Sequence, residues 1–309
     1  MTAQQQHRST AHTHDPNAPG LGRLWTPWRM KYVGGDTGEP GCIFCSRLAG
    51  DDDVASLILL RGECAFSLMN LYPYNTGHLM IVPNAHVATL EDADPADVAA
   101  VAALLHPITR VLRRVLNPAG FNVGLNIGDV AGAGVAEHLH MHVVPRWNGD
   151  ANFMPILAST MVMPELIPAT YAKLRAEIER DHQTTGESAP IALVILDPTA
   201  EHVLIRRHAK DARLFTATPT DEEPVWRSAM RTLEEHKLAV SLVGWAGAAR
   251  TGEQPPALAY VTSSPSTDTR TETRWITIGK AIEALSEKEA VFVRTAVDRI
   301  KPSLPASAG

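Results

Sequence analysis

The sequence predicts an α+β protein built from two domains. At 309 residues the chain is longer than a usual single domain, and each half is large enough to bury a core of its own. In both halves, short apolar runs typical of strands are interspersed with segments whose apolar residues recur at helical spacing. A polar stretch with glycine and proline separates the halves. We therefore expect a tail (residues 1–20), a first domain (21–182), a linker (183–189), a second, smaller domain (190–302) and a frayed end (303–309).

The first domain is predicted to combine a hairpin, further strands and two helices. Arg61 and Gly62 interrupt two apolar runs, which is the pattern of a hairpin. The long helix has an acidic, proline-containing start, late arginines and a Pro-Ala-Gly end. Strands are expected at residues 54–60, 64–69, 77–83 and 121–128, and helices at 92–120 and 164–183.

Three histidines alternate with apolar residues in "HLHMH", at His138, His140 and His142. Strict alternation predicts a strand, with the imidazoles in one row on one face and the apolar residues between them facing the core. A single histidine in such a strand is usually a structural residue. Three in register favour chemistry, because imidazole can be a nucleophile, a proton carrier or a metal ligand near neutral pH.

A glycine-containing loop, "DVAGAGVAE", leads directly into these histidines and includes Gly132, Ala133 and Gly134. Glycines let backbone N–H groups approach and surround an anion, so the loop could form a phosphate site. Taken alone, such a loop is more commonly a simple tight connection, but its position next to the histidine row favours the phosphate site.

The second domain is also predicted to be α+β. Its apolar runs and one amphipathic segment follow each other in the order expected for a hairpin, a helix and later strands. Strands are expected at residues 191–197, 202–207, 257–264 and 273–278, and a helix at 222–239.

Composition excludes several classes of protein. The net charge is −6 and the basic residues are scattered, which argues against binding to a nucleic-acid duplex. No apolar run approaches the length of a membrane span, and the polar start lacks an apolar signal core, so we expect a cytoplasmic protein away from membranes. The pair Cys42 and Cys45 in "CIFC" suggests metal or redox chemistry rather than a structural disulfide.

The segment "EHLHMHVVPRW" resembles the signature of the histidine triad (HIT) family. The upstream segments "NLYPYNTGHLMIVPNAH" and "CIFC" also resemble the family pattern, and the likeness covers roughly residues 21–180. It implies a HIT-type antiparallel sheet with flanking helices. Within the family, "LWTPWRMKYV" and "VVPRW" are similar to the actinobacterial type of diadenosine tetraphosphate phosphorylases.

The resemblance implies roles for the histidines. His140 would be the nucleophile that attacks the α-phosphorus and forms a nucleotidyl-histidine intermediate, which divides one displacement into two steps. His142 would hold and polarise the phosphate, and Glu137 or a backbone carbonyl could fix the tautomer of a ring. Further residues would bind the nucleotide: Asn70 at the ribose, His78 and Asn126 in the pocket wall, Gly132, Ala133 and Gly134 through backbone amides, and Trp147 against the second nucleotide.

The loop departs from the family pattern, which commonly has Gly-Ser or Gln-Ser before the first histidine. Ala133 and Gly134 carry no hydroxyl group, and the loss of one such donor costs roughly 10²-fold in rate where nothing replaces it. The loop therefore predicts a slow enzyme or one with an altered acceptor.

The resemblance also implies a structural zinc ion held by two thiolates and two imidazoles. The ligands would be Cys42, Cys45, His86 and His138. The alternative is a pair of reduced thiols beside unrelated histidines. No redox cofactor is expected. The implied partners are a small nucleotide substrate, inorganic phosphate or water as the acceptor, and a second copy of the chain in a homodimer.

Residues 190–300 weakly resemble a Nudix fold with an eroded Nudix box. Glu223, Arg231 and Glu235 fit the box spacing, whereas Ala217, Thr232 and His236 replace a glycine and two glutamates. A single remaining carboxylate should not hold catalytic magnesium, so we expect no hydrolase activity here. An ordinary amphipathic helix explains the same residues.

Two classes of function stay open beside each other. The first is an enzyme that cleaves a dinucleoside polyphosphate with His140. The second is a nucleotide-binding regulatory protein with weak turnover or none, favoured by the altered loop and the eroded box. A third reading is a hydrolase of nucleoside phosphoramidates or adenylates. The sequence does not separate phosphate from water as the acceptor, because both would enter the same pocket.

Overall fold

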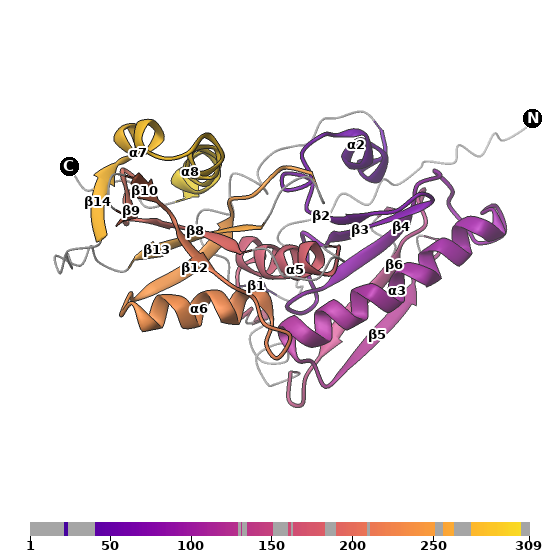
Figure 1. The fold of residues 1–309 in the computed structure, drawn as a ribbon. Helices are drawn as coiled ribbons and strands as arrows, with labels where there is room; N and C mark the ends of the chain where they lie inside the picture. Colours follow the sequence, from indigo (N-terminus) through magenta and orange to yellow (C-terminus); the bar gives the residue numbers. More distant parts are fainter. Residues whose placement is uncertain are drawn as a thin grey trace, which may run out of the picture.

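The computed structural model describes residues 22–23, 41–128, 131, 135–150, 160–161, 163–182, 190–208, 211–250, 256–262 and 273–303. The chain forms two halves, each with its own sheet and flanking helices (Figure 1). This arrangement confirms the predicted α+β class. The predicted tail, the linker 183–189 and residues 304–309 lie outside the described residues.

The N-terminal half is organised around an antiparallel sheet with the strand order β2-β3-β4-β6-β5. The predicted hairpin is present, although its first strand begins later than expected because residues 53–57 form turns and Leu57 has a positive φ of 57°. The strands are β2 (Ile58–Arg61), β3 (Ala65–Met69), β4 (Leu79–Pro83), β5 (Gly120–Leu125) and β6 (Met141–Arg146).

The long predicted helix is α3 (Pro95–Leu116). The Asp94 side chain caps its first turn by accepting a hydrogen bond from Ala96 N, and Asn117 ends it in the left-handed conformation. Among the described residues α3 alone has the length and composition of a membrane span. Its buried face, including Val111 and Leu112, packs into the core beside β3 and β4, as expected for a core helix.

The two faces of this sheet are covered differently. Leu79 and Ile81 of β4 belong to the core shared with α3, whereas Met80 and Val82 pack on the other face with Phe44 of α2 (Ile43–Ala49). This alternation follows from the two-residue period of a strand. The α2 face is the one that carries the histidines.

The predicted histidine strand is partly wrong. β6 begins only at Met141, so His142 lies in the strand while His138 and His140 precede it in irregular backbone. Here Leu139 N donates a hydrogen bond to Val87 O instead of joining the β4 ladder. The alternation predicts a strand from His138 onward, but the hydrogen bond between Leu139 and Val87 keeps this segment out of the sheet until Met141.

The C-terminal half contains a mixed sheet. Its main order is β10-β9-β8-β13-β12, with β11 added on β8 and β14 on β9, and β8 runs parallel to β13. The predicted strands at 191–197, 202–207, 257–264 and 273–278 are confirmed with small shifts. The strands are β8 (Ile191–Leu196), β9 (His202–His208), β10 (Asp211–Arg213), β11 (Phe215–Ala217), β12 (Val240–Trp245), β13 (Ala257–Thr262) and β14 (Thr273–Thr277).

Helices cover both faces of the mixed sheet. The predicted α6 (Val225–Glu235) packs on one face, while α7 (Ile278–Ala284) and α8 (Glu287–Ile300) pack on the other. The sequence interpretation did not include α8 as a helix, although Ser286 caps it and acidic residues follow in its first turn.

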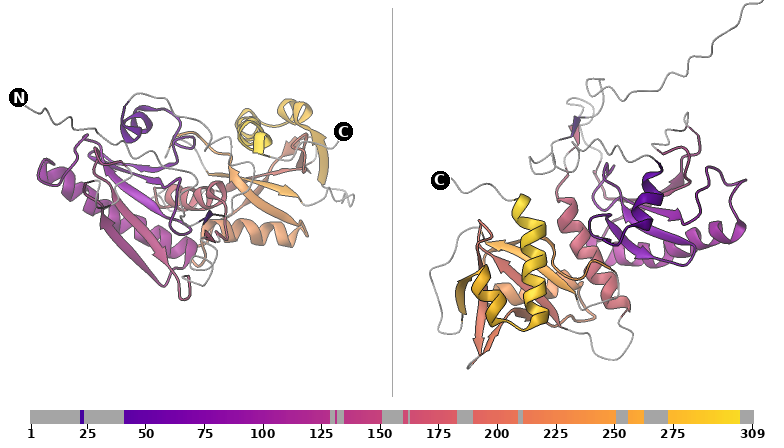
Figure 2. Two further views of the ribbon diagram at one scale, coloured as in Figure 1. Left: turned by 180° about the vertical axis from the view of Figure 1, so that it is seen from behind. Right: turned by 90° about the horizontal axis from the view of Figure 1, so that it is seen from above.

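The helix α5 (Ile167–His182) connects the halves. It lies between the two sheets (Figure 2) and contacts α3 and β2 on one side and α6 and β12 on the other. One apolar cluster consequently runs through both halves, from Ile81 to Tyr171 to Leu258. The boundaries proposed from the sequence stay predictions, but the cores are joined through α5.

Candidate active site

Two of the three triad histidines lie close together on the α2 face of the N-terminal sheet. The ring centroids of His140 and His142 are 4.9 Å apart and nearly perpendicular. His140 is 3% exposed, and the ring of Phe44 lies 5.1 Å from it. The side chain of Phe44, which lies between Cys42 and Cys45 in the sequence, therefore forms part of the wall of this site.

The hydrogen bond of His140 fixes its tautomer. Its Nδ1 lies 2.8 Å from the carbonyl oxygen of His138, and because a carbonyl only accepts, Nδ1 must carry the proton. Burial lowers the pKa of His140, which keeps the ring neutral near neutral pH. A neutral ring protonated on Nδ1 has a free lone pair on Nε2, the atom that a nucleophile needs.

His78 and His142 form an oriented pair. Tyr74 N donates to Nδ1 of His78 at 3.0 Å, so the His78 proton resides on Nε2, which lies 2.9 Å from Nδ1 of His142. His142 therefore accepts on Nδ1 and, when neutral, carries its own proton on Nε2. Burial, with a smaller contribution from His140, lowers the pKa of His142 to about 4, so this Nε2–H donor is present at neutral pH.

Two further residues border this pair. Asn70 Nδ2 lies 3.5 Å from His78 Nε2, while Asn70 Oδ1 accepts from Tyr72 N. Tyr74 is 47% exposed, and its ring lies 5.9 Å from the ring of His142. The sequence interpretation included Asn70 and His78 but missed Tyr74. The available signal was an aromatic residue three positions before Gly77.

The backbone before His78 needs a glycine. Gly77 has φ +75°, and a Cβ atom there would stand 2.4 Å from Cδ1 of Leu116. Both features exclude a larger side chain without rearrangement. Gly77 thus allows β4 to start against α3 with His78 turned into the site.

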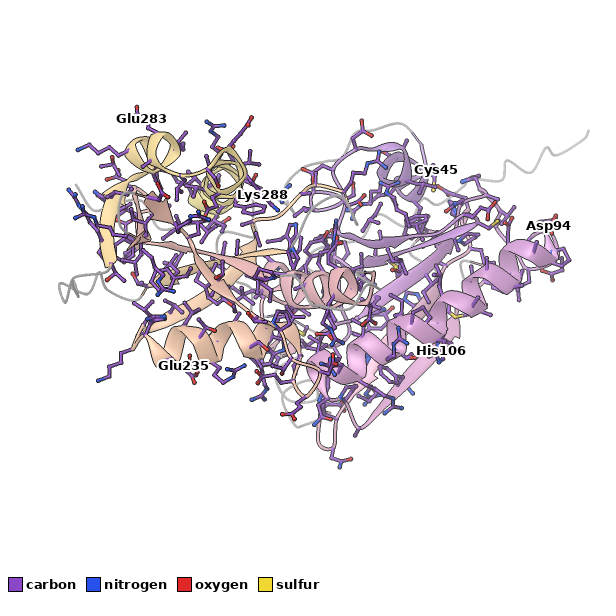
Figure 3. The ribbon with its side chains drawn as sticks, in the orientation of Figure 1. Cys45, Asp94, His106, Glu235, Glu283 and Lys288 are labelled. Atoms are coloured by element: carbon purple, nitrogen blue, oxygen red, sulfur yellow. The ribbon has the colours of Figure 1, made fainter. Side chains whose placement is uncertain are left out.

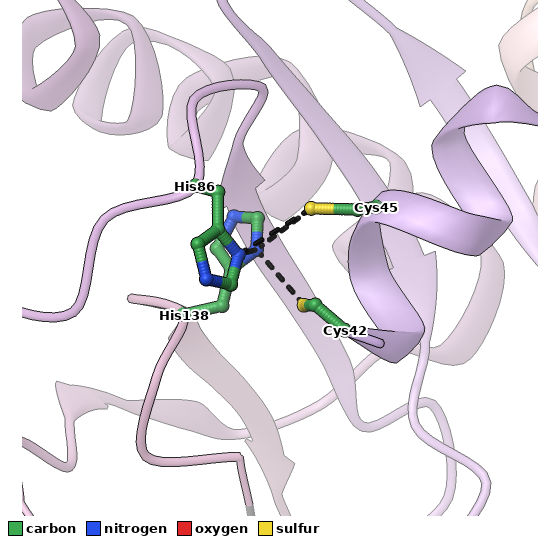
Figure 4. A group of neighbouring side chains, drawn as sticks. All are labelled: Cys42, Cys45, His86 and His138. Carbon is green, nitrogen blue, oxygen red and sulfur yellow. Dashed lines mark hydrogen bonds between the residues drawn. The ribbon is translucent and has the colours of Figure 1, made fainter. Parts of the chain in front are cut away.

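The four predicted zinc ligands come together in a second cluster (Figure 4). Their ligand atoms all lie within 4.8 Å of one another, and among the described residues this is the one group of its kind. The Nδ1 atom of His138 lies 3.2 Å from Cys42 Sγ, 3.6 Å from Cys45 Sγ and 3.3 Å from Nδ1 of His86. The edges of a tetrahedral Cys₂His₂ zinc site are roughly 3.3–3.8 Å long, and these three separations are close to that range.

The protonation of His138 also fits a metal ligand. Its Nε2 lies 3.0 Å from the carbonyl oxygen of Pro83, which places the proton on Nε2 and leaves the Nδ1 lone pair facing the sulfur atoms. Such a hydrogen bond from the second ring nitrogen is the usual support for a ligating histidine. Burial and the Cys42 thiol raise the pKa of Cys45, so loading a metal would release a proton.

Of the other predicted nucleotide-binding residues, the structure describes Asn126 and Trp147. Asn126 follows β5 directly after Leu125, which pairs with Met141, the residue after His140. Trp147 follows the far end of β6, roughly 16 Å from His142 by the rise of a strand. Gly132, Ala133 and Gly134 lie outside the described residues.

In the C-terminal half, the residues of the eroded Nudix box form ion pairs. Arg231 contacts Glu223 at 2.8 Å and Glu235 at 3.6 Å. The hydrogen bond from Arg231 holds the pKa of Glu223 below its ordinary value. Glu235 lies on α6 (Figure 3). Both carboxylates are thus engaged by a guanidinium, which is a different arrangement from a cluster of oxygen ligands around a cation.

Comparison with known proteins agrees with this geometry. The family model of the HIT domain matches residues 53–149. A Mycobacterium tuberculosis (strain ATCC 25618 / H37Rv) protein named AP-4-A phosphorylase is 42% identical over 168 residues, covering 52% of this chain and 86% of that protein. The chain therefore belongs to the HIT family.

More distant relatives include the asymmetrical bis(5'-nucleosyl)-tetraphosphatase of Schizosaccharomyces pombe, 28% identical over 31% of this chain and 53% of that protein. A solved structure described as a Zn-bound histidine triad family protein from Mycobacterium smegmatis is 31% identical, covers 45% of this chain and 94% of that one, and has a TM-score of 0.37. Relatives with named activities are enzymes, and this chain is an enzyme of the HIT family.

Proposed function

We propose that the chain cleaves diadenosine tetraphosphate with inorganic phosphate through a nucleotidyl intermediate on His140. The observation that carries the proposal is the free Nε2 lone pair of His140, fixed by the bond from Nδ1 to the His138 carbonyl. The 42% identity to a protein named AP-4-A phosphorylase also supports the proposal.

The geometry supports a two-step reaction. In the first step, Nε2 of His140 attacks the α-phosphorus, an N–P bond forms, and the bond to the bridging oxygen breaks so that ATP leaves. In the second step, an oxygen of inorganic phosphate attacks the same phosphorus, releases His140 and yields ADP. The Nε2–H of His142 donates to a phosphoryl oxygen and stabilises the charge that develops there.

Binding of the nucleotide would rest on the polar groups around the pair. His78 contacts His142 directly, Asn70 lies beside His78, and Asn126 follows Leu125 at the end of β5. Backbone amides of Gly132, Ala133 and Gly134 would face the phosphates, and Trp147 would cover the second nucleotide at the end of β6. These roles are part of the proposal.

The Cys42, Cys45, His86 and His138 cluster would hold a structural zinc ion. A closed Cys₂His₂ site supplies a cross-link between α2, the segment after β4 and the triad backbone. His138 then serves the metal, and its carbonyl oxygen orients His140. No bond-making step uses this ion.

The remaining proposals concern assembly and location. β5 lies at an edge of its sheet with Val123 43% exposed, and among the described residues no strand pairs with its outer edge. An exposed edge of this kind suits pairing with a second chain, so we propose a homodimer, to be tested by size-exclusion chromatography with light scattering. A cytoplasmic location and a Nudix-related origin of the C-terminal half stay predictions.

The first experiment is incubation of the purified protein with diadenosine tetraphosphate, with and without inorganic phosphate, followed by chromatography of the products. ADP plus ATP that appear only with phosphate would support the phosphorylase. AMP plus ATP regardless of phosphate would replace it with a hydrolase. Nucleotide binding without turnover would favour the regulatory reading and contradict the proposal.

A further inference from the structure

A cavity of about 490 Å³ lies between the two halves, away from the triad. It is bounded by the end of α3, one side of α5 and the first turn of α6, and its lining includes Leu116, Lys173, Trp226 and Arg227. This volume falls in the range of small-molecule sites, which occur preferentially at junctions between domains.

Cationic side chains outnumber carboxylates among the residues that line the cavity. Three cationic side chains, Arg114, Lys173 and Arg227, face one carboxylate, Glu165, although the chain as a whole carries a net charge of −6. The bias therefore arises from the local arrangement. A cavity with excess positive charge concentrates small anions.

The cationic groups differ in how far they are already engaged. Arg114 pairs with Glu177 at 2.5 Å and also donates to carbonyl oxygens of the loop before α6, so its guanidinium is used within the protein. Lys173 pairs with Glu165. Arg227 is exposed, and among the described residues no hydrogen bond or ion pair of 4 Å or less engages its guanidinium.

Trp226 contacts two of these cations, Lys173 and Arg227. The Lys173 Nζ atom lies 4.1 Å from the centre of the Trp226 ring, and the Arg227 guanidinium carbon lies 5.0 Å from it. The indole is itself anchored, because Nε1 donates to Val115 O at 3.3 Å. Lys173 and Arg227 thus both contact the same indole ring through cation–π interactions before any ligand binds.

We infer that this cavity binds a small phosphate monoester, with its phosphate between Lys173 and Arg227. Guanidinium and ammonium groups are the usual donors to phosphate oxygens. The apolar side chains of Leu116, Pro164 and Pro224 line the same space and suit the sugar or base of a mononucleotide. An occupant would touch α3, α5 and α6 together and so stabilise the junction of the halves.

The test is ¹⁹F NMR of the 309-residue chain labelled with 5-fluorotryptophan. The chain has six tryptophans, and Trp226→Phe identifies the resonance of Trp226. The probes are AMP, ribose 5-phosphate, inorganic phosphate and adenosine. We expect a saturable shift of the Trp226 resonance with AMP or ribose 5-phosphate and none with adenosine. If inorganic phosphate binds as tightly as AMP, the cavity is a simple phosphate site and the assignment to a phosphate monoester is overturned.

Arg227→Ala should weaken this binding about tenfold or more, the size expected for one charge-assisted hydrogen bond. Arg207→Ala, which removes an exposed arginine on β9 away from the cavity, is the matched control and should leave the affinity unchanged. The inference is overturned if no phosphorylated probe shifts the Trp226 resonance saturably. It is also overturned if Arg227→Ala binds as tightly as the wild type.

Discussion

The Nε2 atom of His78 lies 2.9 Å from Nδ1 of His142, and the backbone N–H of Tyr74 points at the other nitrogen of His78. A peptide N–H can only donate, so the direction of every hydrogen bond in this chain of groups is fixed from the backbone outward. This series of hydrogen bonds ends at the Nε2–H group of His142. The fold thereby selects the tautomer of His142, which lies two residues after the proposed nucleophile His140 in the sequence.

Replacement of His78 tests this orientation. His78→Leu removes the donor to His142, and we expect a loss of roughly 10- to 100-fold in kcat with a smaller change in KM, as for other groups that orient a reacting side chain. His78→Gln can present an amide N–H at a similar reach and should retain most activity. Steady-state kinetics on diadenosine tetraphosphate compares them, and equal losses in both variants would contradict an orienting role.

Replacement of His140 tests the nucleophile. His140→Ala should lower turnover by roughly 10⁴-fold or more, because it removes the lone pair that we propose bonds to phosphorus. The matched control is His106→Ala, since His106 is exposed on α3 (Figure 3) and should leave turnover unchanged. Chromatography of ADP and ATP gives the rates. Turnover by His140→Ala at more than a tenth of the wild-type rate would exclude the nucleophilic role.

Folding stability should depend on pH through His142. Burial lowers the pKa of His142 from its ordinary value of 6.5 to about 4, so between these values the unfolded chain binds a proton that the folded chain does not. Stability therefore rises with pH across this window and is lost as pH falls through it. Allowing for the partly exposed ring, the titration of His142 should lower the free energy of unfolding by on the order of 1–2 kcal/mol as pH falls through this window.

Urea denaturation of wild type and His142→Asn measures this contribution at several pH values. The variant has no titrating group at the position, so the difference in unfolding free energy between the two proteins should change in the acid window and be constant above it. The comparison also cancels any acid effect on the metal cluster. A difference that does not vary with pH would show that His142 titrates normally.

Removal of a predicted zinc ligand should release the metal. Elemental analysis of the purified protein is expected to give about one zinc ion per chain, as a closed four-ligand site holds. Cys42→Ser should abolish this and lower thermal stability, while Cys64→Ser, which alters the cysteine outside the cluster, should keep both. A metal-free wild type with unchanged stability after treatment with a chelator would contradict the site.

Much of the N-terminal half could be predicted because its local signals agree with its packing. The cap at Asp94, the left-handed end at Asn117 and the apolar periodicity of α3 all point to the same helix. The gathering of Cys42 with His138 was available only by resemblance, since nothing local relates residues so far apart. The irregular backbone at His138 was not predictable, because hydrogen bonds from distant segments override the alternation.

The C-terminal half shows the opposite balance. Its buried strands β8 and β13 were recognisable as continuous apolar runs, the pattern of strands covered on both faces. Their parallel pairing and the role of α5 between the sheets depend on tertiary packing, which a single sequence does not encode locally. The sequence therefore did not predict the junction of the halves or the cavity between α3, α5 and α6.

The junction itself depends on Glu177, whose side chain is 1% exposed. Its carboxylate pairs with Arg114 at 2.5 Å and Arg180 at 2.7 Å, and it accepts a hydrogen bond from Val225 N at the start of α6. The residue therefore links α3, α5 and α6 at one point. Removing one partner from such a buried group leaves the others uncompensated.

Glu177→Gln should destabilise the protein by about 3 kcal/mol or more, the usual cost of breaking a buried ion pair from one side. Glu222→Gln removes an exposed carboxylate from the loop before α6 and should change stability by no more than about 0.5 kcal/mol. Urea denaturation followed by tryptophan fluorescence measures both. Because Glu177 holds α6 against α5, we expect the Glu177→Gln transition to broaden or split as the halves separate before each unfolds. An unchanged midpoint would show that apolar packing along α5 alone holds the halves together.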